Sequence, residues 1–226
     1  MSALGPPIGL EPRGGDAPAR SPLDGVSTRS GVSGIVLAAG RSSRMGSPKP
    51  LLPVGGEPLL RHVVRAAAAS WLDEVLVVVG YEADRIGSAI GDMGHRLIPN
   101  PGYLDGQGSS LRTGVAAISP GSAAVLVLLG DQPEVTTPVI NAVIAAHGET
   151  GAPIVRPSYR GVPGHPVLFG RGHLPALLAM SGDAGARDLL RRHAAAIVRV
   201  DIDANPPPDV DTPEAFAALV ARWPPG

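Results

Sequence analysis

Two continuous apolar runs constrain the fold of this chain more than any other feature of its sequence. Residues 75–79 and 124–129 contain no polar side chain, so neither run has a face suited to water. Strands of this kind occur in parallel sheets that are covered by helices on both sides. Strand-like and helix-like patterns alternate around them, which favours an α/β layer with a mainly parallel sheet.

The rest of the chain supplies the expected partners of these two strands. We expect a small inserted β-piece near residues 153–170 and one domain spanning 31–226, because no internal repeat is present. Residues 1–30 are rich in Gly, Pro, Ser and Ala without an apolar period, which predicts a flexible tail. The predicted strands are 35–38, 74–79, 96–98, 124–129, 153–156, 165–169 and 197–201, and the predicted helices are 59–69, 82–90, 109–118, 137–147, 173–180, 184–193 and 213–223.

The composition of the chain excludes several classes of function. A formal net charge of -1 gives no electrostatic footprint for nucleic acid or for a membrane surface. The absence of cysteine removes disulfides, thiolate catalysis and cysteine-based zinc sites, and it fits a cytoplasmic protein. No apolar run approaches the roughly 18–20 residues that a membrane-spanning helix needs. We therefore expect partners that are small molecules, with no nucleic acid and no membrane.

The segment 39–49 follows the first predicted strand and is both small and basic. Ligands bind beyond the carboxyl ends of strands in open α/β sheets, so this segment should border a binding crevice. Gly40 lets the backbone approach a ligand, while Arg44 and Lys49 supply charge suited to phosphate oxygens. The segment matches neither the P-loop nor the dinucleotide fingerprint, and its composition alone is equally typical of a solvated loop.

The order of residues in this segment resembles the signature loop of an enzyme superfamily. LAAG at 37–40 is followed by RMG at 44–46 and then by Lys49 and Leu51. This pattern is similar to the loop with which NTP-transferases bind a nucleoside triphosphate. Within that superfamily the chain resembles the molybdenum cofactor cytidylyltransferase-like group, the molybdopterin nucleotidyltransferases. The resemblance covers about residues 32–223 and implies a Rossmann-like, three-layer nucleotidyltransferase fold.

The resemblance also implies roles for residues of the loop. Arg44 would contact phosphate, and Lys49 would neutralise charge on the α-phosphate as it is attacked, as the electrostatics of phosphoryl transfer require. Arg44, Lys49 and Asp131 are the expected catalytic residues. The residues expected to bind the nucleotide are Leu37, Ala38, Ala39, Gly40, Arg44, Lys49, Gly80, Gly106 and Ser110.

Two acidic positions are expected to hold a metal ion. Asp131 comes directly after a buried strand, where a carboxylate suits Mg²⁺, although it is also a common turn or helix-capping residue. The resemblance implies that the Asp of the Gly-Asp-x-Pro element binds the metal. It also implies a second ligand from the DVDTPE element at 209–214, with Asp211 as first choice and Asp209 as second, although both are equally suited to cap the following helix.

Further positions are expected to read the two substrates. In cytidylyltransferase branches a Gly-x-x-x-Ser segment reads the pyrimidine, and Gly106 and Ser110 match it here. Ala39 stands where guanylyltransferases have glycine, which favours CTP over GTP. His165 and Arg187 would bind the second substrate, although a lone His on a strand is more often structural and Arg187 could simply pair with a neighbouring acid.

Together these residues predict transfer of CMP from CTP to the terminal phosphate of a molybdopterin-type cofactor, with release of pyrophosphate and with Mg²⁺ as cofactor. The product would pass to a molybdoenzyme. Three alternatives stay open. They are a GTP-using enzyme, a sugar- or polyol-phosphate nucleotidyltransferase, and an accessory protein that binds nucleotide or cofactor without turnover.

Overall fold

A computed structural model describes residues 30–40, 47–182 and 186–223 of the chain. The tail predicted at 1–30 lies outside the described residues except for Ser30, so its boundary stays a prediction. Ser30 and Gly31 are anchored to the domain, because their backbone N–H groups donate to the carboxylate of Asp73 at 2.9 and 3.0 Å.

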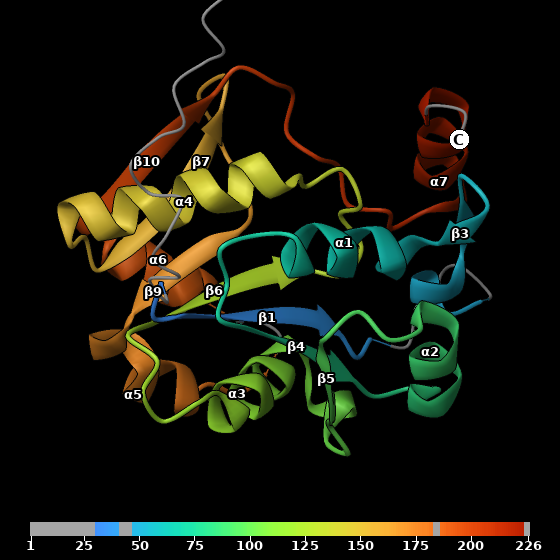
Figure 1. Ribbon diagram of the computed structural model, residues 1–226, viewed down its shortest axis with the longest axis horizontal. Helices are drawn as coiled ribbons and strands as arrows, with labels where there is room; N and C mark the ends of the chain where they lie inside the picture. The colour runs from blue at the N-terminus through green and yellow to red at the C-terminus, as the bar shows by residue number, and fades with distance from the viewer. Residues whose placement is uncertain (1–29, 41–46, 183–185, 224–226) are drawn as a thin grey trace, which may run out of the picture.

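An eight-stranded sheet forms the centre of the molecule (Figure 1). Its path runs β10-β7-β9-β6-β1-β4-β5, with β8 paired to β7. The strands are β1 (Val32–Ala38), β4 (Glu74–Val79), β5 (Arg96–Pro99), β6 (Ala124–Leu129), β7 (Ile154–Tyr159), β8 (Val162–Pro163), β9 (Val167–Gly170) and β10 (Ile197–Ile202). A separate pair, β2 (Pro53–Val54) and β3 (Glu57–Pro58), forms a small antiparallel sheet.

The main sheet is mostly parallel, as the two apolar runs predict. β1 pairs in parallel with both β4 and β6, β4 pairs in parallel with β5, and β7 does so with β10. Only β9 and the short β8 run antiparallel to their neighbours. The carboxyl ends of β1, β4 and β6 consequently lie side by side at one edge of the sheet.

Helices cover both faces of the sheet and complete three layers. Figure 1 shows α1 and α4 on one side and α3 and α5 on the other. The helices are α1 (Leu59–Ala68), α2 (Ala83–Ile90), α3 (Gln107–Ala117), α4 (Thr137–Thr150), α5 (Leu174–Leu178), α6 (Arg187–Arg192) and α7 (Pro213–Arg222), with short 3₁₀ turns η1 (Lys49–Leu51), η2 (Tyr103–Asp105), η3 (Arg171–His173) and η4 (Ala194–Ala196). The predicted α/β class and its layers are confirmed.

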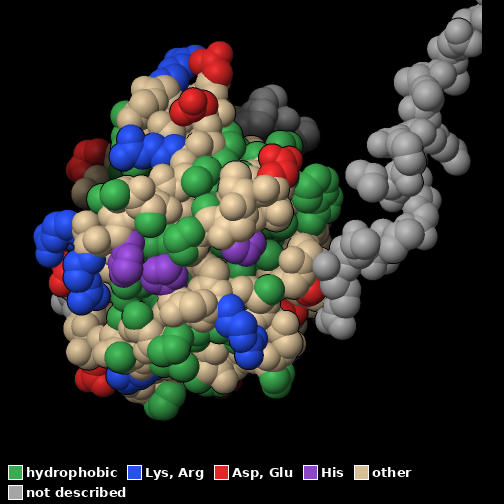
Figure 2. Space-filling model, turned by 90° about the vertical axis from the view of Figure 1, so that its left-hand side faces the viewer, with side chains coloured by type: hydrophobic (Ala, Val, Ile, Leu, Met, Phe, Trp, Pro, Cys, Tyr) green, Lys and Arg blue, Asp and Glu red, His purple; other side chains and the backbone are tan. Residues whose placement is uncertain are grey.

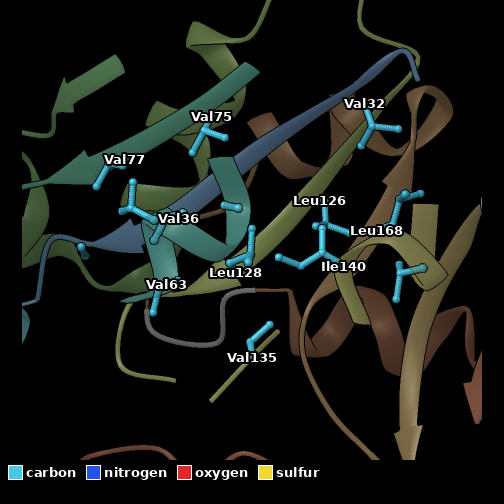
Figure 3. Packing of buried hydrophobic residues seen from close by; sticks show 14 of the residues in the cluster. Val32, Val36, Val63, Val75, Val77, Leu126, Leu128, Val135, Ile140 and Leu168 are labelled. Atoms are coloured by element: carbon cyan, nitrogen blue, oxygen red, sulfur yellow. The ribbon is translucent and has the colours of Figure 1, made fainter. Parts of the chain in front are cut away.

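Each face of the sheet has its own apolar core. Apolar residues of α1, α2 and α4 pack on one face, where each fully buried Val, Leu or Ile side chain contributes roughly 1.5–3 kcal/mol (Figure 3). Apolar residues of α3, α5 and α6 pack on the other. Because side chains alternate along a strand, β1 sends Val36 to the first core and Ile35 to the second.

A third apolar cluster ties the C-terminal segment to the rest of the chain. Val210 and Leu219 pack with Val54 and Leu59, so α7 covers the small β2–β3 sheet. The hydroxyl of Thr212 accepts a hydrogen bond from the Ala215 N–H and caps α7. Residues 208–211, which lead into this helix, are thereby held beside the loop that follows β6.

The structure refines several predicted boundaries. β4 and β6 have the predicted bounds, whereas the strand predicted from residue 165 begins at Val167, because Pro166 has no N–H to donate to a ladder. The strands expected as an inserted piece near 153–170 are present, and β7 and β9 are integral strands of the main sheet. The helix predicted from residue 173 begins one residue later, at Leu174, after His173 in η3.

The molecular surface carries mixed charge. On the face drawn in Figure 2, basic and acidic side chains are interspersed and histidines lie close together. The rings of His173 and His193 stand in an edge-on arrangement with centroids 4.8 Å apart. Within the described ranges, no helix combines the length and apolarity that crossing a bilayer would require.

Candidate active site

A cavity of about 500 Å³ opens at the carboxyl ends of β1 and β6. One wall is the end of β1 with the residues after it, the opposite wall is η2 with the start of α3, and the floor is formed around η1 and the loop after β6. The lining residues are Leu37, Ala38, Ala39, Gly40, Lys49, Pro50, Tyr103, Leu104, Gly106, Gln107, Ser110, Leu129, Gly130 and Asp131. The cavity occupies the place where ligands bind in open α/β sheets.

Most of the residues predicted to bind a nucleotide lie around this one cavity. Its lining includes the whole LAAG segment at 37–40 together with Lys49, Gly106, Ser110 and Asp131. Arg44 lies outside the described residues. Gly80 stands behind the wall, where a Cβ atom would lie 2.8 Å from the Ala39 carbonyl oxygen and 2.6 Å from the Tyr103 Cβ. Because Gly80 has no side chain, Ala39 and Tyr103 can both pack closely against the end of β4.

Lys49 joins the two predicted metal-binding acids across the cavity floor. Its Nζ lies 3.5 Å from Asp131 Oδ2 and forms a short ion pair with Asp211 Oδ1. Lys49 is also the only lysine of the sequence, since every other basic residue among the 19 Lys and Arg is arginine. Because all other basic residues of the chain are arginines, the lysine at position 49 indicates that a compact ammonium group suits the space between Asp131 and Asp211 better than a planar guanidinium group.

Backbone contacts explain how residues so distant in sequence meet. The Val210 N–H donates to the Asp131 carbonyl oxygen at 3.2 Å, and the Val210 side chain is buried in the third apolar cluster. This contact leaves Asp211 facing Lys49. Asp209 instead accepts a hydrogen bond from Gln132 Nε2 at 2.7 Å. Of the two acids that the sequence left open, Asp211 is the one that forms an ion pair with Lys49 among the described residues.

The environment of Asp131 favours a bound cation. Burial raises the pKa of its carboxyl above the ordinary value, Lys49 opposes that effect, and the negative charges of Asp209 and Asp211 raise it further. An ionised Asp131 at neutral pH is therefore costly without positive charge nearby. The Lys49 ammonium supplies such charge and lies between the two carboxylates.

Asp131 and Asp211 suit a divalent ion on the chemistry of their donors. Two carboxylates placed to share one ammonium group can also share one metal ion, and Mg²⁺ prefers one or two carboxylates completed by phosphate oxygens and water. No group of three or more His, Cys, Asp or Glu side chains arranged for a metal is found in ranges 30–40, 47–182 and 186–223. These two acids fit a metal that arrives with a phosphorylated ligand.

The wall opposite β1 is held by residues that sequence reasoning did not single out. Asn100 is 4% exposed, and its Nδ2 donates to Ser109 Oγ at 3.0 Å and to Ser110 Oγ at 3.1 Å. Gly106 begins α3 with φ +90°, a conformation that favours glycine. Asn100 directly follows β5 at the same sheet edge, and this position is the signal that could have identified it.

The two residues predicted to bind a second substrate lie outside this lining. His165 is half-buried, and its Nδ1 is shut off from solvent with no hydrogen-bond partner among the described residues. The pKa of His165 is lowered to about 4, mainly by burial and also by the positive charges of Arg156 and Arg187, while the Val127 backbone and Asp209 act in the opposite direction. These charges place Arg156 and Arg187 in the same neighbourhood as His165.

Arg156 was not predicted and is unusual among the arginines. It is half-buried on β7, and its Nε and Nη2 donate to the Gly164 carbonyl oxygen at 3.1 and 2.9 Å. Burial lowers the pKa of its guanidinium, and so does the charge of Arg199, which lies beside it in register on β10. Among the described side chains, no carboxylate forms an ion pair with Arg156 or Arg187.

Comparison with known proteins agrees with this geometry. The nicotine blue oxidoreductase of Paenarthrobacter nicotinovorans is 31% identical over 84% of this chain and 96% of its own length. The purine catabolism protein PucB of Bacillus subtilis is 34% identical over 81% of this chain and 93% of its own. The crystal structure of Rv0371c from Mycobacterium tuberculosis in complex with manganese superposes with a TM-score of 0.73 at 26% identity, covering 84% of this chain and 97% of that one.

The family match settles what these similarities share. Residues 34–197 match the family described as the MobA-like NTP transferase domain, and this range runs from β1 to the start of β10. The match contains the LAAG segment, Lys49 and Asp131, and it confirms the resemblance that the loop predicts. The chain belongs to the MobA-like NTP transferase family.

Proposed function

We propose that this nucleotidyltransferase moves CMP from CTP to the terminal phosphate of a molybdopterin-type cofactor and releases pyrophosphate. The observation that carries the proposal is the arrangement of Lys49 between Asp131 and Asp211, in which Lys49 and Asp131 line the cavity and Asp211 lies next to Lys49. This arrangement provides one fixed cation and two acids, which are the parts that phosphoryl transfer from a triphosphate requires. The activity is assigned to residues 31–226.

The proposed reaction needs positioning and charge neutralisation rather than a protein nucleophile. An acceptor phosphate oxygen forms a bond to the α-phosphorus of CTP, and the bond from that phosphorus to the oxygen bridging to the β-phosphate breaks. No base is required, because the attacking oxygen is already anionic at neutral pH. Lys49 stabilises the charge that grows on the α-phosphate, and Arg44 contacts the departing phosphates.

Asp131 and Asp211 would hold Mg²⁺ together with phosphate oxygens. A bound divalent ion neutralises triphosphate charge and acts as a Lewis acid toward the phosphoryl oxygens. The manganese complex of Rv0371c supports a divalent ion in this family. In this chain Asp131 and Asp211 would hold the ion, and the Lys49 ammonium between them would supply a further positive charge toward the nucleotide.

The nucleotide is proposed to be CTP. Ala39 lines the cavity and carries a methyl group that a glycine would lack, so it leaves less room beside it for a purine than for a pyrimidine. Gly106 and Ser110 form the opposite wall and are assigned to the base. Leu37, Ala38 and Gly40 are assigned to backbone contact with the nucleotide, and Gly80 to the space that the walls need.

The acceptor is proposed to lie beside His165, Arg187 and Arg156. Among the described side chains, no carboxylate forms an ion pair with the two arginines of this cluster, and Asp209, whose charge acts on His165, accepts a hydrogen bond from Gln132 next to Asp131. An anionic group of a phosphorylated pterin would complete it. The product would then pass to a molybdoenzyme.

One experiment tests the whole assignment. The purified protein is incubated with each of the four NTPs, Mg²⁺ and molybdopterin, or its molybdenum-loaded form, and products are read by mass spectrometry and by pyrophosphate release. We expect a dinucleotide of the pterin with CTP. A product with GTP instead would mean that the enzyme uses GTP. Parallel mixtures contain sugar or polyol phosphates in place of the pterin, and a product only in those mixtures would assign the enzyme to that class.

Two further outcomes would remove the transferase assignment. Nucleotide binding without turnover under every combination would identify an accessory protein. Because a relative at 31% identity is named an oxidoreductase, the same mixtures are also assayed with a reduced nicotinamide cofactor. Oxidation of that cofactor without pyrophosphate release would contradict nucleotidyl transfer.

A further inference from the structure

Asn100 is held in one orientation at the edge of the cavity. Its backbone N–H donates to the Val79 carbonyl oxygen at 2.7 Å, which ties it to the end of β4. Its side-chain Oδ1 accepts a hydrogen bond from the Gly102 N–H at 3.0 Å. Because a backbone N–H can only donate, this bond decides which end of the amide is oxygen and which is nitrogen. The Asn100 NH₂ group must therefore face α3.

The two hydrogens of that NH₂ group reach two adjacent serines. Asn100 Nδ2 lies 3.0 Å from Ser109 Oγ and 3.1 Å from Ser110 Oγ, and both hydroxyl oxygens act as acceptors. The amide of Asn100 is then fully used, as a buried amide requires. Both serines consequently share the same donor, and the difference between them lies in their own hydroxyl protons.

Ser109 uses its proton inside the turn. Its Oγ is 2.8 Å from the Gly102 carbonyl oxygen and 2.9 Å from the Gly106 carbonyl oxygen. Ser110 instead lines the cavity, and within the described part of the chain no acceptor is bonded to its hydroxyl. A hydroxyl whose oxygen accepts from Asn100 must send its proton elsewhere. The hydroxyl proton of Ser110 therefore points into the cavity.

We infer that Asn100 is a positioning residue that fixes Ser110 as a hydrogen-bond donor toward the nucleotide base, so that the cavity selects a base presenting an acceptor there. The inference rests on the proposed function, which puts a nucleotide in this cavity. Cytosine and uracil both present an acceptor at O2, but only cytosine presents one at N3, where uracil carries a hydrogen, so the Ser110 proton is assigned to N3 of the base. Asn100 thereby selects cytosine over uracil through Ser110 without touching the base itself.

Three substitutions separate this role from a structural one. Asn100→Asp replaces the amide donor with a carboxylate acceptor, so the Ser110 proton turns toward residue 100 and its oxygen lone pairs face the ligand. Ser110→Ala removes the hydroxyl. Ser109→Ala is the matched control, because it loses a bond to the same amide but does not line the cavity. Binding of CTP and UTP with Mg²⁺ is measured by titration calorimetry.

We expect Ser110→Ala to weaken CTP binding about five- to tenfold, the effect of one neutral hydrogen bond, and Ser109→Ala to stay within about twofold of wild type. Asn100→Asp should lose the preference for CTP over UTP. The added charge repels both triphosphates equally, so the ratio of the two dissociation constants is the readout. If Asn100→Asp does not fold, Asn100→Leu, which lacks the donor, should reduce the same ratio.

The results that would overturn the inference are specific. Equal losses of CTP binding in Ser109→Ala and Ser110→Ala would show that the serines only build the turn. An unchanged CTP-to-UTP ratio in a folded Asn100 variant would remove the positioning role. If the variants change CTP and UTP binding as expected but the protein transfers no nucleotide, this inference stands and the proposed function is wrong. If the protein binds no nucleotide, both are wrong.

Discussion

The cavity floor (Lys49, Asp131 and Asp211) and the basic cluster (Arg156, His165 and Arg187) handle charge in opposite ways. On the floor, one ammonium group lies between two carboxylates, so positive and negative charge meet within the protein itself. In the basic cluster, two guanidinium groups act on a half-buried imidazole, and no described carboxylate forms an ion pair with either. Under the proposed function, the floor receives a metal ion together with a triphosphate, and the cluster receives an anion alone.

Among the substitutions that test this difference between the floor and the cluster, those of Lys49 are expected to change kcat the most. Lys49→Ala should lower kcat roughly 10²–10³-fold, the scale seen when a single charge-stabilising donor is removed, while CTP affinity changes much less. Lys49→Arg should recover little, because a planar guanidinium does not replace a compact ammonium between two acids. Steady-state kinetics with pyrophosphate release measures both. Arg222→Ala, which removes an arginine paired with Glu134 outside the cavity, is the control.

The single lysine permits an independent measurement. An amine-acylating reagent should modify Lys49 and otherwise only the chain's α-amino group, and CTP with Mg²⁺ should protect Lys49 from it. Peptide mass spectrometry reads the protection directly. Wild-type turnover in Lys49→Ala, or modification unaffected by CTP, would contradict the place given to this residue.

The two acids of the DVDTPE element give the next largest effect. Asp211→Asn should lower kcat about 10²-fold and raise the Mg²⁺ concentration needed for half-maximal rate, because it removes one of two proposed ligands. Asp209→Asn keeps the hydrogen bond with Gln132 possible and should change the rate less than about fivefold. Magnesium titrations of both variants measure this difference. A larger effect at Asp209 would exchange the two assignments.

The sequence predicts the floor better than the cluster, for a physical reason. Residues 75–79 and 124–129 are apolar throughout, so the carboxyl end of each run is visible in the sequence. Asp131 lies just beyond the second run, and the LAAG segment ends β1, the strand that lies between β4 and β6. The ion pair from Lys49 to Asp211 spans 162 positions and depends on Val210 being buried beside β6, which no local pattern encodes.

Arg156 and Asn100 escape prediction because their signals are tertiary. β9 is antiparallel to both neighbours, and this pairing brings His165 and Gly164 against Arg156 on β7. An arginine within a strand gives no sign of being half-buried. Asn100 likewise carries no motif, and its importance comes from two serines nine and ten positions later turning back toward it.

The dependence of stability on acid pH tests the environment of the His165 imidazole. In the unfolded chain the pKa of His165 has its ordinary value of 6.5, whereas burial and the neighbouring arginines lower it to about 4 in the folded protein. Between these values only the unfolded chain binds the proton, so stability is complete above the upper value and falls as pH drops toward the lower one. The loss at His165 is expected to be about 1–3 kcal/mol.

Urea unfolding of wild type and His165→Gln at about pH 7 and about pH 5 measures this loss. Wild type should lose more free energy of unfolding than the variant. Burial also lowers the pKa of His95 and of His173, but both proteins retain those groups, so the difference between wild type and variant isolates His165. Parallel pH dependence in the two proteins would show that the imidazole is not buried neutral.

The smallest effect tests whether the basic cluster receives the acceptor. Arg187→Gln should raise the acceptor KM about tenfold, the scale of one charge-assisted hydrogen bond, and leave CTP binding unchanged. Arg192→Gln removes an exposed arginine from the same helix and is the matched control. If Arg187→Gln weakens CTP instead, the cluster belongs to the triphosphate. The floor and the basic cluster would then form one binding site for the nucleotide rather than two sites for two substrates.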